Sequence, residues 1–203
     1  MLIYGASGHA KVVIDCLKSM NERILAVFDD DPGKKMFLEY VVINDYLADI
    51  YPDEEIMISI GDNRIRKELA EGKIKHDFGR ASHSSALISP GVSAGEGSVV
   101  FHKSVIQAGC EIGKHVIINT SASVDHDCRI GDYVHIAPGA VLCGDVAVGE
   151  GTLVGAGSVV IPGIKIGAWC VIGAGSVVVQ DVPDHSMIVG NPGRVVRKLK
   201  DQS

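Results

Sequence analysis

The chain has 203 residues, a formal net charge of −6 and 46% hydrophobic residues. That length allows one large domain or two small ones, with enough apolar residues to bury a core. The negative charge argues against nucleic acid or an anionic membrane surface as the main partner. No run approaches the ~18 apolar residues of a membrane span, and the opening MLIYGASGHA is not a secretory pattern. We therefore expect a cytoplasmic protein without a membrane span.

The first part of the chain alternates between strand-like and helix-like segments. MLIY, RILAVFDD and EIMISIGDN are short apolar runs typical of buried strands. GASGHAKVVIDCLKSM opens with a glycine turn and continues with apolar residues three or four positions apart, which predicts a helix. RIRKELAEGK predicts a second, more polar helix. Strands that alternate with helices in this way predict a parallel, Rossmann-like sheet.

From Ile88 to Val178 an aliphatic residue or alanine recurs at every sixth position without interruption. This hexapeptide repeat predicts a parallel β-helix. Three hexads, or eighteen residues, would form one triangular coil, stacked about 4.8 Å from the next. The predicted fold is therefore an α/β Rossmann-like domain, residues 1–83, followed by a β-helix, residues 84–203. The sequence after Val178 has two prolines and a basic tail, and we expect it to cap the β-helix.

The whole chain resembles the bacterial sugar acyltransferases with hexapeptide repeats. It is most similar to the UDP-4-amino-sugar N-acetyltransferases, with the sialic-acid O-acetyltransferase-like proteins as close relatives. The motifs that carry this resemblance are YGASGHA, FDDD, IGDNRIRK, SALISP, NTSASVDHDCRIGDYVHIAPGA, GAGSVVIPG and VGNPGRVVRK. The resemblance implies a left-handed β-helix, a homotrimer, and acetyl-CoA as co-substrate with no tightly bound cofactor. It also implies that the N-terminal domain holds the nucleotide sugar and that His126 and Asp127 form the catalytic base pair.

The positions of two histidines can be derived from the repeat alone. His126 and His135 are nine residues apart, which is half of an eighteen-residue coil. In one chain they should face opposite sides of the β-helix and cannot share a small substrate. A neighbouring chain could bring its His135 to His126, so the spacing supports a trimer with sites between subunits.

Residues eighteen positions apart should stack in columns along the β-helix. Gly144 lies above His126 and should leave room for a ligand. A column of small residues follows Asn119 and should form a smooth groove for the pantetheine arm of acetyl-CoA. Basic groups in the cap would meet the 3′-phosphate of the cofactor. The expected acetyl-CoA-binding residues are Asn119, His135, Gly144, Gly155, Ala156, Gly173, Ala174, Pro192 and Arg194.

The expected chemistry is the attack of an amine on a thioester, which requires the amine to lose a proton. A neutral imidazole is well matched to accept that proton near pH 7. Asp127 would orient His126 and stabilise the imidazolium that forms. His135, or the backbone N–H of Gly144, would donate a hydrogen bond to the thioester oxygen. The predicted catalytic residues are therefore His126, Asp127 and His135.

The GASGHA turn follows a strand and opens a helix, which is a favourable position for a phosphate. Asp29 and Asp30 end the second strand, where Rossmann-like folds read a ribose, although a solvated acidic turn is the alternative. In the family that the chain resembles, this region binds the UDP part of the sugar. The expected substrate-binding residues are Ser7, Gly8, His9, Asp29, Asp30 and Asn63.

We expect a structural role for four further histidines, which are His83, His102, His115 and His185. We expect no metal, because His126 and His135 lack a third ligand at a suitable spacing. The main hypothesis is an acetyl-CoA-dependent N-acetyltransferase that acts on the 4-amino group of a UDP-4-amino-4,6-dideoxy sugar in bacterial glycan biosynthesis. One alternative is an O-acetyltransferase that acts on sialic acid or another sugar hydroxyl. Another is a β-helix that binds a nucleotide sugar without turnover.

Overall fold

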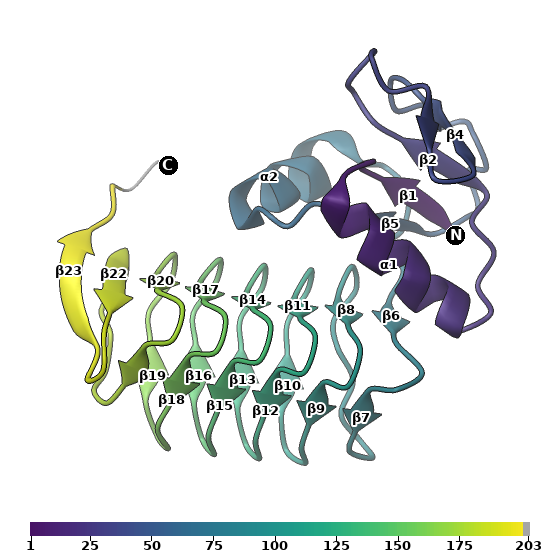
Figure 1. The fold of residues 1–203 in the computed structure, drawn as a ribbon. Coiled ribbons are helices and arrows are strands. Elements are labelled where there is room, and N and C mark those ends of the chain that lie inside the picture. The colour runs from purple at the N-terminus through teal and green to yellow at the C-terminus, as the bar shows by residue number, and fades with distance from the viewer. Residues whose placement is uncertain (201–203) are drawn as a thin grey trace.

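The computed structural model describes residues 1–200 and shows a small α/β domain beside one end of a long β-helix (Figure 1). The α/β domain has a five-stranded sheet in the order β3-β4-β2-β1-β5, parallel except for β3. Its elements are β1 (Leu2–Tyr4), α1 (Gly8–Ser19), β2 (Ala26–Phe28), β3 (Met36–Phe37), β4 (Tyr40–Ile43), β5 (Ile56–Ile58), α2 (Asn63–Glu68) and a π-helical turn (Leu69–Lys73).

The predicted parallel sheet and both predicted helices are confirmed. The hairpin of β3 and β4 was not predicted from the sequence. Its strands are short and its side chains are mostly exposed, so the segment lacks the continuous apolar run of a buried strand. The second helix ends in a π-helical turn rather than continuing as an α-helix, close to Gly72.

The β-helix has three faces, each a parallel sheet of short strands (Figure 1). The first face contains β6 (Ala81–Ser82), β8 (Val99–Val100), β11 (Ile117–Ile118), β14 (His135–Ile136), β17 (Leu153–Val154), β20 (Val171–Ile172), β22 (Ser186–Val189) and the antiparallel β23 (Arg194–Lys198). The second face contains β7 (Leu87–Ile88), β9 (Val105–Ile106), β12 (Ser123–Val124), β15 (Val141–Leu142), β18 (Val159–Val160) and β21 (Val177–Val178). The third face contains β10 (Glu111–Ile112), β13 (Arg129–Ile130), β16 (Ala147–Val148) and β19 (Lys165–Ile166).

The strand register confirms the coil of eighteen residues. Ile118 pairs with Ile136, and Val124 pairs with Leu142. From β7 to β21 the second residue of each strand points inward, and these side chains form one continuous apolar core. Many glycines that follow it have a packing reason: a Cβ at Gly155 would lie 2.4 Å from the carbonyl oxygen of Ile172 in the next coil.

The chain turns a corner three times in each coil, and these corners form three edges. We call the corner after the first face the first edge; it includes Asn119, Ala137, Gly155 and Gly173. The second edge follows the second face and includes His126 and Gly144. The third edge follows the third face and includes His115, Tyr133, Gly151 and Trp169.

The α/β domain shares a hydrophobic core with the first face. Val13 and Leu17 of α1 belong to the same buried cluster as Phe101 and Ile117 of the β-helix. Burial of apolar surface on both sides stabilises the junction by roughly 25 cal/mol for each Å² removed from water. The two parts therefore pack as one body along α1.

Arg66 of α2 fastens the α/β domain to the third edge. Its side chain is 1% exposed, and Nε donates a hydrogen bond of 2.9 Å to the carbonyl oxygen of His115. Nη2 donates bonds of 2.8 Å to the carbonyl oxygen of Tyr133 and to Oδ1 of Asn63. Nη1 donates a bond of 3.1 Å to the carbonyl oxygen of Ile60. One buried cation thus satisfies carbonyl groups in both parts of the chain.

The ends of the β-helix differ in how they are closed. Val182 and Ile188 are buried in the last turn of the core, so the segment after Val178 covers it as expected, while every residue of β23 is exposed. At the other end β6 already pairs with β8, so we propose that the β-helix begins near residue 81 rather than 84. Among residues 1–200, no helix has the length and apolarity needed to cross a membrane.

Replacing Arg66 with alanine should lower the free energy of unfolding by at least about 3 kcal/mol, because it leaves buried carbonyl groups without donors. The neighbouring Arg64 stacks on Trp169, with Cζ 4.6 Å from the ring centroid. Its replacement by alanine should lower the free energy of unfolding by about 1 kcal/mol or less. Urea denaturation of both variants measures the difference. Equal stability of the two would contradict the role assigned to Arg66.

Candidate active site

His126 and Asp127 form a solvent-exposed pair on the second edge. Nδ1 of His126 lies 2.8 Å from Oδ2 of Asp127. The carboxylate accepts a hydrogen bond from Nδ1–H, which leaves the lone pair of Nε2 free to accept a proton from a substrate. Asp127 has a φ of 60°, a left-handed conformation that brings its short side chain back to the ring. The pairing expected from the sequence is therefore present, even though the acidic residue is aspartate.

Two glycines, one in each neighbouring coil, make room for this pair. A Cβ at Gly109 would lie 2.3 Å from Oδ1 of Asp127. A Cβ at Gly144 would lie 2.5 Å from both Cε1 and Nε2 of His126. The space above His126 is therefore filled by its own ring, which corrects the expectation that Gly144 leaves this space for a ligand.

The electrostatic surroundings of His126 suit a base. The hydrogen bond to Asp127 raises the pKa of His126, and the charge of Asp125 adds to that effect. The charge of Asp145 raises the pKa of His126 to a smaller extent. A raised pKa makes the neutral ring a stronger base towards a substrate proton.

His135 lies on the first face, beneath the α/β domain of its own chain. Its Nε2 accepts a hydrogen bond of 3.0 Å from Nδ2 of Asn119, whose Oδ1 is held by the N–H of Thr120. Because Nε2 accepts this bond, the ring proton lies on Nδ1. A hydrogen bond from His135 to a thioester oxygen would therefore have to come from Nδ1, and this role of His135 stays a prediction.

The pKa values of His9 and His135 are shifted in the opposite direction to that of His126, because these two rings are buried. Burial, together with the charge of Arg66, lowers the pKa of each to about 4. Their ring centroids are 6.4 Å apart, and Nε2 of His9 is buried without a hydrogen-bond partner in the described part of the chain. Both rings are neutral at pH 7, so they can position a substrate but are too weakly basic to accept its proton.

The residues expected to bind acetyl-CoA lie mainly along the first edge. Asn119, Gly155 and Gly173 follow one another in successive coils, with Ala156 and Ala174 beside them. A Cβ at Gly173 would lie 2.8 Å from Cγ1 of Val189, just before the turn that contains Pro192. Arg194 begins β23, where Nη1 donates a hydrogen bond to the carbonyl oxygen of Gly193. Gly144 is the exception, because it lies on the second edge with His126.

The expected nucleotide-binding residues meet at the carboxyl edge of the parallel sheet. Ser7 caps α1 but makes no side-chain hydrogen bond to it, so the hydroxyl and the first N–H groups of the helix are free for a ligand. Gly8 offers open space, since a Cβ there would meet nothing within 4 Å. His9 is the next residue of the same helix turn. We therefore propose that the nucleotide sugar binds at this helix N-terminus, at Ser7, Gly8 and His9.

The two aspartates at the end of β2 differ, because Asp29 is buried and Asp30 is exposed. Asp29 is buried and accepts hydrogen bonds from the N–H of Ala6 at 2.7 Å and from Nζ of Lys34 at 2.8 Å. Burial raises its pKa, but these donors outweigh burial and leave the pKa below its usual value. Asp29 thus shapes the β1–α1 turn. Asp30 is exposed, bonds to Tyr4 Oη at 2.6 Å and pairs with Lys73, which places it at the edge where a ribose could reach it.

Asn63 is used for docking rather than left free for a sugar. Its Nδ2 donates a hydrogen bond of 3.0 Å to the carbonyl oxygen of Gly151, and its Oδ1 accepts from Arg66. The structure does not support a direct contact to the nucleotide by this side chain. It also reveals a pocket that the sequence did not indicate, between α2 and the first face, with Asn63, Arg64, His135, Leu153 and Trp169 among its lining residues.

The comparisons with known proteins agree with this architecture. The family model described as the PglD N-terminal domain matches residues 1–72. The model for six repeats of the bacterial transferase hexapeptide matches residues 109–144 and 145–180. A perosamine N-acetyltransferase from Caulobacter crescentus, solved with CoA and GDP-perosamine, is 40% identical, with 96% of this chain and 95% of that chain aligned and a TM-score of 0.91. The chain belongs to the hexapeptide-repeat amino-sugar N-acetyltransferase family.

Two further relatives support the same family. The acetyltransferase domain of PglB from Neisseria gonorrhoeae FA1090 is 34% identical, over 96% of this chain and 98% of that chain, with a TM-score of 0.89, and it has also been solved with acetyl coenzyme A. A UDP-N-acetylbacillosamine N-acetyltransferase from Bacillus subtilis (strain 168) is 40% identical over 106 residues. That match spans 48% of this chain and about half, 49%, of the curated relative.

Replacing Gly144 with alanine should push the His126 ring away from its position and weaken the bond to Asp127. We expect the pKa of His126, raised in the native protein, to move back towards 6.5 in this variant. NMR titration of the histidine ring measures it. Gly72→Ala is the matched control, because a Cβ there would meet nothing within 4 Å. An unchanged His126 titration in Gly144→Ala would show that the ring does not depend on this glycine.

Proposed function

We propose that the protein transfers the acetyl group of acetyl-CoA to the 4-amino group of a UDP-linked 4-amino-4,6-dideoxy sugar, as a step of bacterial glycan biosynthesis. The observation that carries this proposal is the exposed His126–Asp127 pair, with a contact of 2.8 Å and a raised pKa. The relatives are named as N-acetyltransferases of amino sugars, which favours an amine over a sugar hydroxyl as the acceptor.

The reaction follows from the tautomer of His126. The sugar amine attacks the carbonyl carbon of the thioester, and Nε2 of His126 accepts the amine proton. The negative charge that develops on the carbonyl oxygen needs a donor. The N–H of Gly144 fits this role, because it has no hydrogen-bond acceptor among residues 1–200 and lies against the His126 ring. Cleavage of the C–S bond then releases the thiolate of CoA, which takes the proton from the imidazolium.

The active site requires two chains in this proposal. His126 lies on the second edge, whereas His9, His135 and Asn119 lie at the first face and first edge of the same chain. The coil of eighteen residues holds these two groups on different sides of the β-helix. A homotrimer would bring the His126 edge of one chain to the sugar-binding side of the next, with acetyl-CoA in between along the small residues of the first edge.

The relatives differ in the nucleotide part of the substrate. The Bacillus relative is named for a UDP-linked sugar, whereas the Caulobacter protein was solved with a GDP-linked sugar. The carboxyl edge of the sheet offers the free N-terminus of α1 for the phosphates and Asp30 for a ribose hydroxyl. These groups suit the diphosphate and ribose of either nucleotide, so the choice of UDP rests on the resemblance of the motifs.

Replacing His126 with asparagine should lower kcat by roughly 10²–10⁴, the usual loss for a general base. In the native protein, kcat should fall as the pH drops through the raised pKa of His126, because only the neutral ring accepts a proton. In Asp127→Asn the acidic limb should shift to lower pH and kcat should decrease. Steady-state kinetics from pH 5.5 to pH 9 tests both variants. Turnover of His126→Asn at the native rate would remove His126 from the mechanism.

A panel of acceptors tests the substrate. We expect thiol release from acetyl-CoA with UDP-4-amino-4,6-dideoxy sugars, at a higher kcat/KM than with the GDP- and dTDP-linked sugars. Sialic acids and sugars whose amine is already acetylated should give no release. Preference for a GDP-linked amine would correct the nucleotide alone. Release with a sialic acid but with no amine would favour the O-acetyltransferase, and no release with any acceptor would favour binding without turnover.

A further inference from the structure

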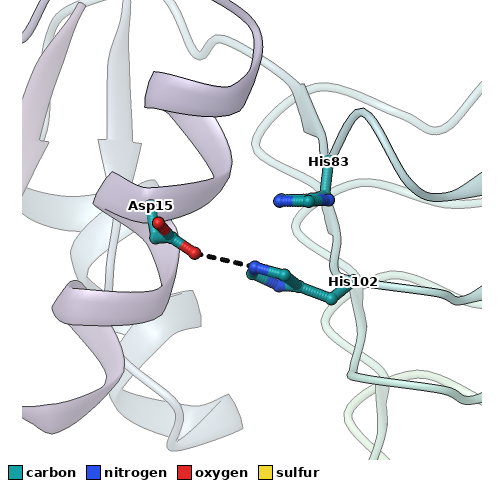
Figure 2. A group of neighbouring side chains, drawn as sticks. All are labelled: Asp15, His83 and His102. Atoms are coloured by element: carbon teal, nitrogen blue, oxygen red, sulfur yellow. Dashed lines mark hydrogen bonds and ion pairs between the residues drawn. The ribbon is translucent and has the colours of Figure 1, made fainter.

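Three side chains with metal-binding chemistry meet where α1 approaches the start of the β-helix. Asp15 comes from α1, His83 from the loop after β6, and His102 from the loop after β8 (Figure 2). Each offers one ligand atom, and these three atoms all lie within 4.8 Å of one another. No part of the proposed acetyl transfer uses these side chains.

The arrangement brings two imidazole rings and a carboxylate to one side. The ring centroids of His83 and His102 are 3.6 Å apart, with an angle of 26° between the planes. Nε2 of His102 lies 2.7 Å from Oδ2 of Asp15, and both rings project towards α1 (Figure 2). A neutral imidazole is the form that binds a metal ion.

Ser85 supports ligation by Nε2 of His83. Its Oγ lies 2.8 Å from Nδ1 of His83 and accepts a hydrogen bond of 3.1 Å from the N–H of Lys103. The N–H of Ser85 also donates a hydrogen bond of 3.0 Å to Nδ1. Ligation of a metal ion by Nε2 requires the ring proton on Nδ1, from where it can be donated to Oγ of Ser85. That tautomer loses the bond from the Ser85 N–H, and the bond from Nδ1 to Oγ then orients the ligand ring.

We propose that Asp15, His83 and His102 bind a divalent transition-metal ion, with Zn²⁺ as the representative, and that the ion ties α1 to the first coils of the β-helix. Two imidazoles and one carboxylate are a common ligand set for Zn²⁺, and water can complete the coordination. The metal would lie on the first edge. His102 is eighteen residues before Thr120, which follows Asn119 on that edge, so His102 occupies the same column one coil earlier. It would act as a cross-link between the two parts of the chain. This proposal replaces the expectation of no metal, which considered only His126 and His135.

Zn²⁺ binding to the full chain, after removal of metals with a chelator, tests this site by competition with a chromogenic chelator. We expect one ion per chain. His83→Gln, His102→Gln and the surface variant Asp15→Asn should each weaken binding by about tenfold or more. His126→Asn is the matched control, because it removes the other exposed histidine that pairs with an aspartate, and it should leave binding unchanged.

Thermal unfolding gives a second readout that does not depend on activity. Saturating Zn²⁺ should raise the Tm of the native chain, because the ion binds only the folded arrangement. The Tm of the His83→Gln and His102→Gln variants should not respond. The proposal is overturned if the native chain shows no saturable binding, or if these variants bind Zn²⁺ as tightly as the native chain while His126→Asn does not.

Discussion

The buried guanidinium of Arg66 is the interaction on which the arrangement of the two domains depends. It donates to carbonyl groups of α2 and its preceding loop, and to two successive coils of the third edge, at His115 and Tyr133. Burial lowers its pKa to about 10, so it remains charged at neutral pH. A buried charge is tolerated only when its donors are satisfied, and here carbonyl groups from both parts of the chain satisfy them. Arg66 thereby fixes where the carboxyl edge of the sheet lies above the first face.

Burial divides the histidines into two classes. Burial, followed by the positive charge of Arg66, lowers the pKa of His9 and His135 to about 4, so both rings stay neutral. His126 is exposed on the second edge, and its partner Asp127 raises its pKa. One side of the β-helix thus provides neutral groups that can hold a sugar, and another provides a base. The division of roles follows from environment rather than from residue type.

The sequence predicted those features that follow from periodicity. The hexad pattern specified the coil, its core and the columns, and it placed Asn119 beside His135, which is confirmed by a contact of 3.0 Å. Periodicity could not show which face the α/β domain covers, so the burial of His135 beneath that domain, the docking role of Asn63 and the hydrogen bonds of Arg66 were missed. It also did not reveal that Gly144 holds the His126 ring, although the eighteen-residue spacing pointed to their contact. The Asp15, His83 and His102 group joins two domains and has no local signature.

The central claim is that one active site combines His126 of one chain with the sugar-binding side of another. Coexpression of His126→Ala and His135→Ala chains tests it most directly, since each variant alone should be nearly inactive. If each site draws these two residues from different chains, random mixing restores one intact site in four, so acetyl transfer should recover to about a quarter of the native rate. Mixed oligomers as inactive as the separate variants would show that a single chain supplies the whole site and would contradict this account.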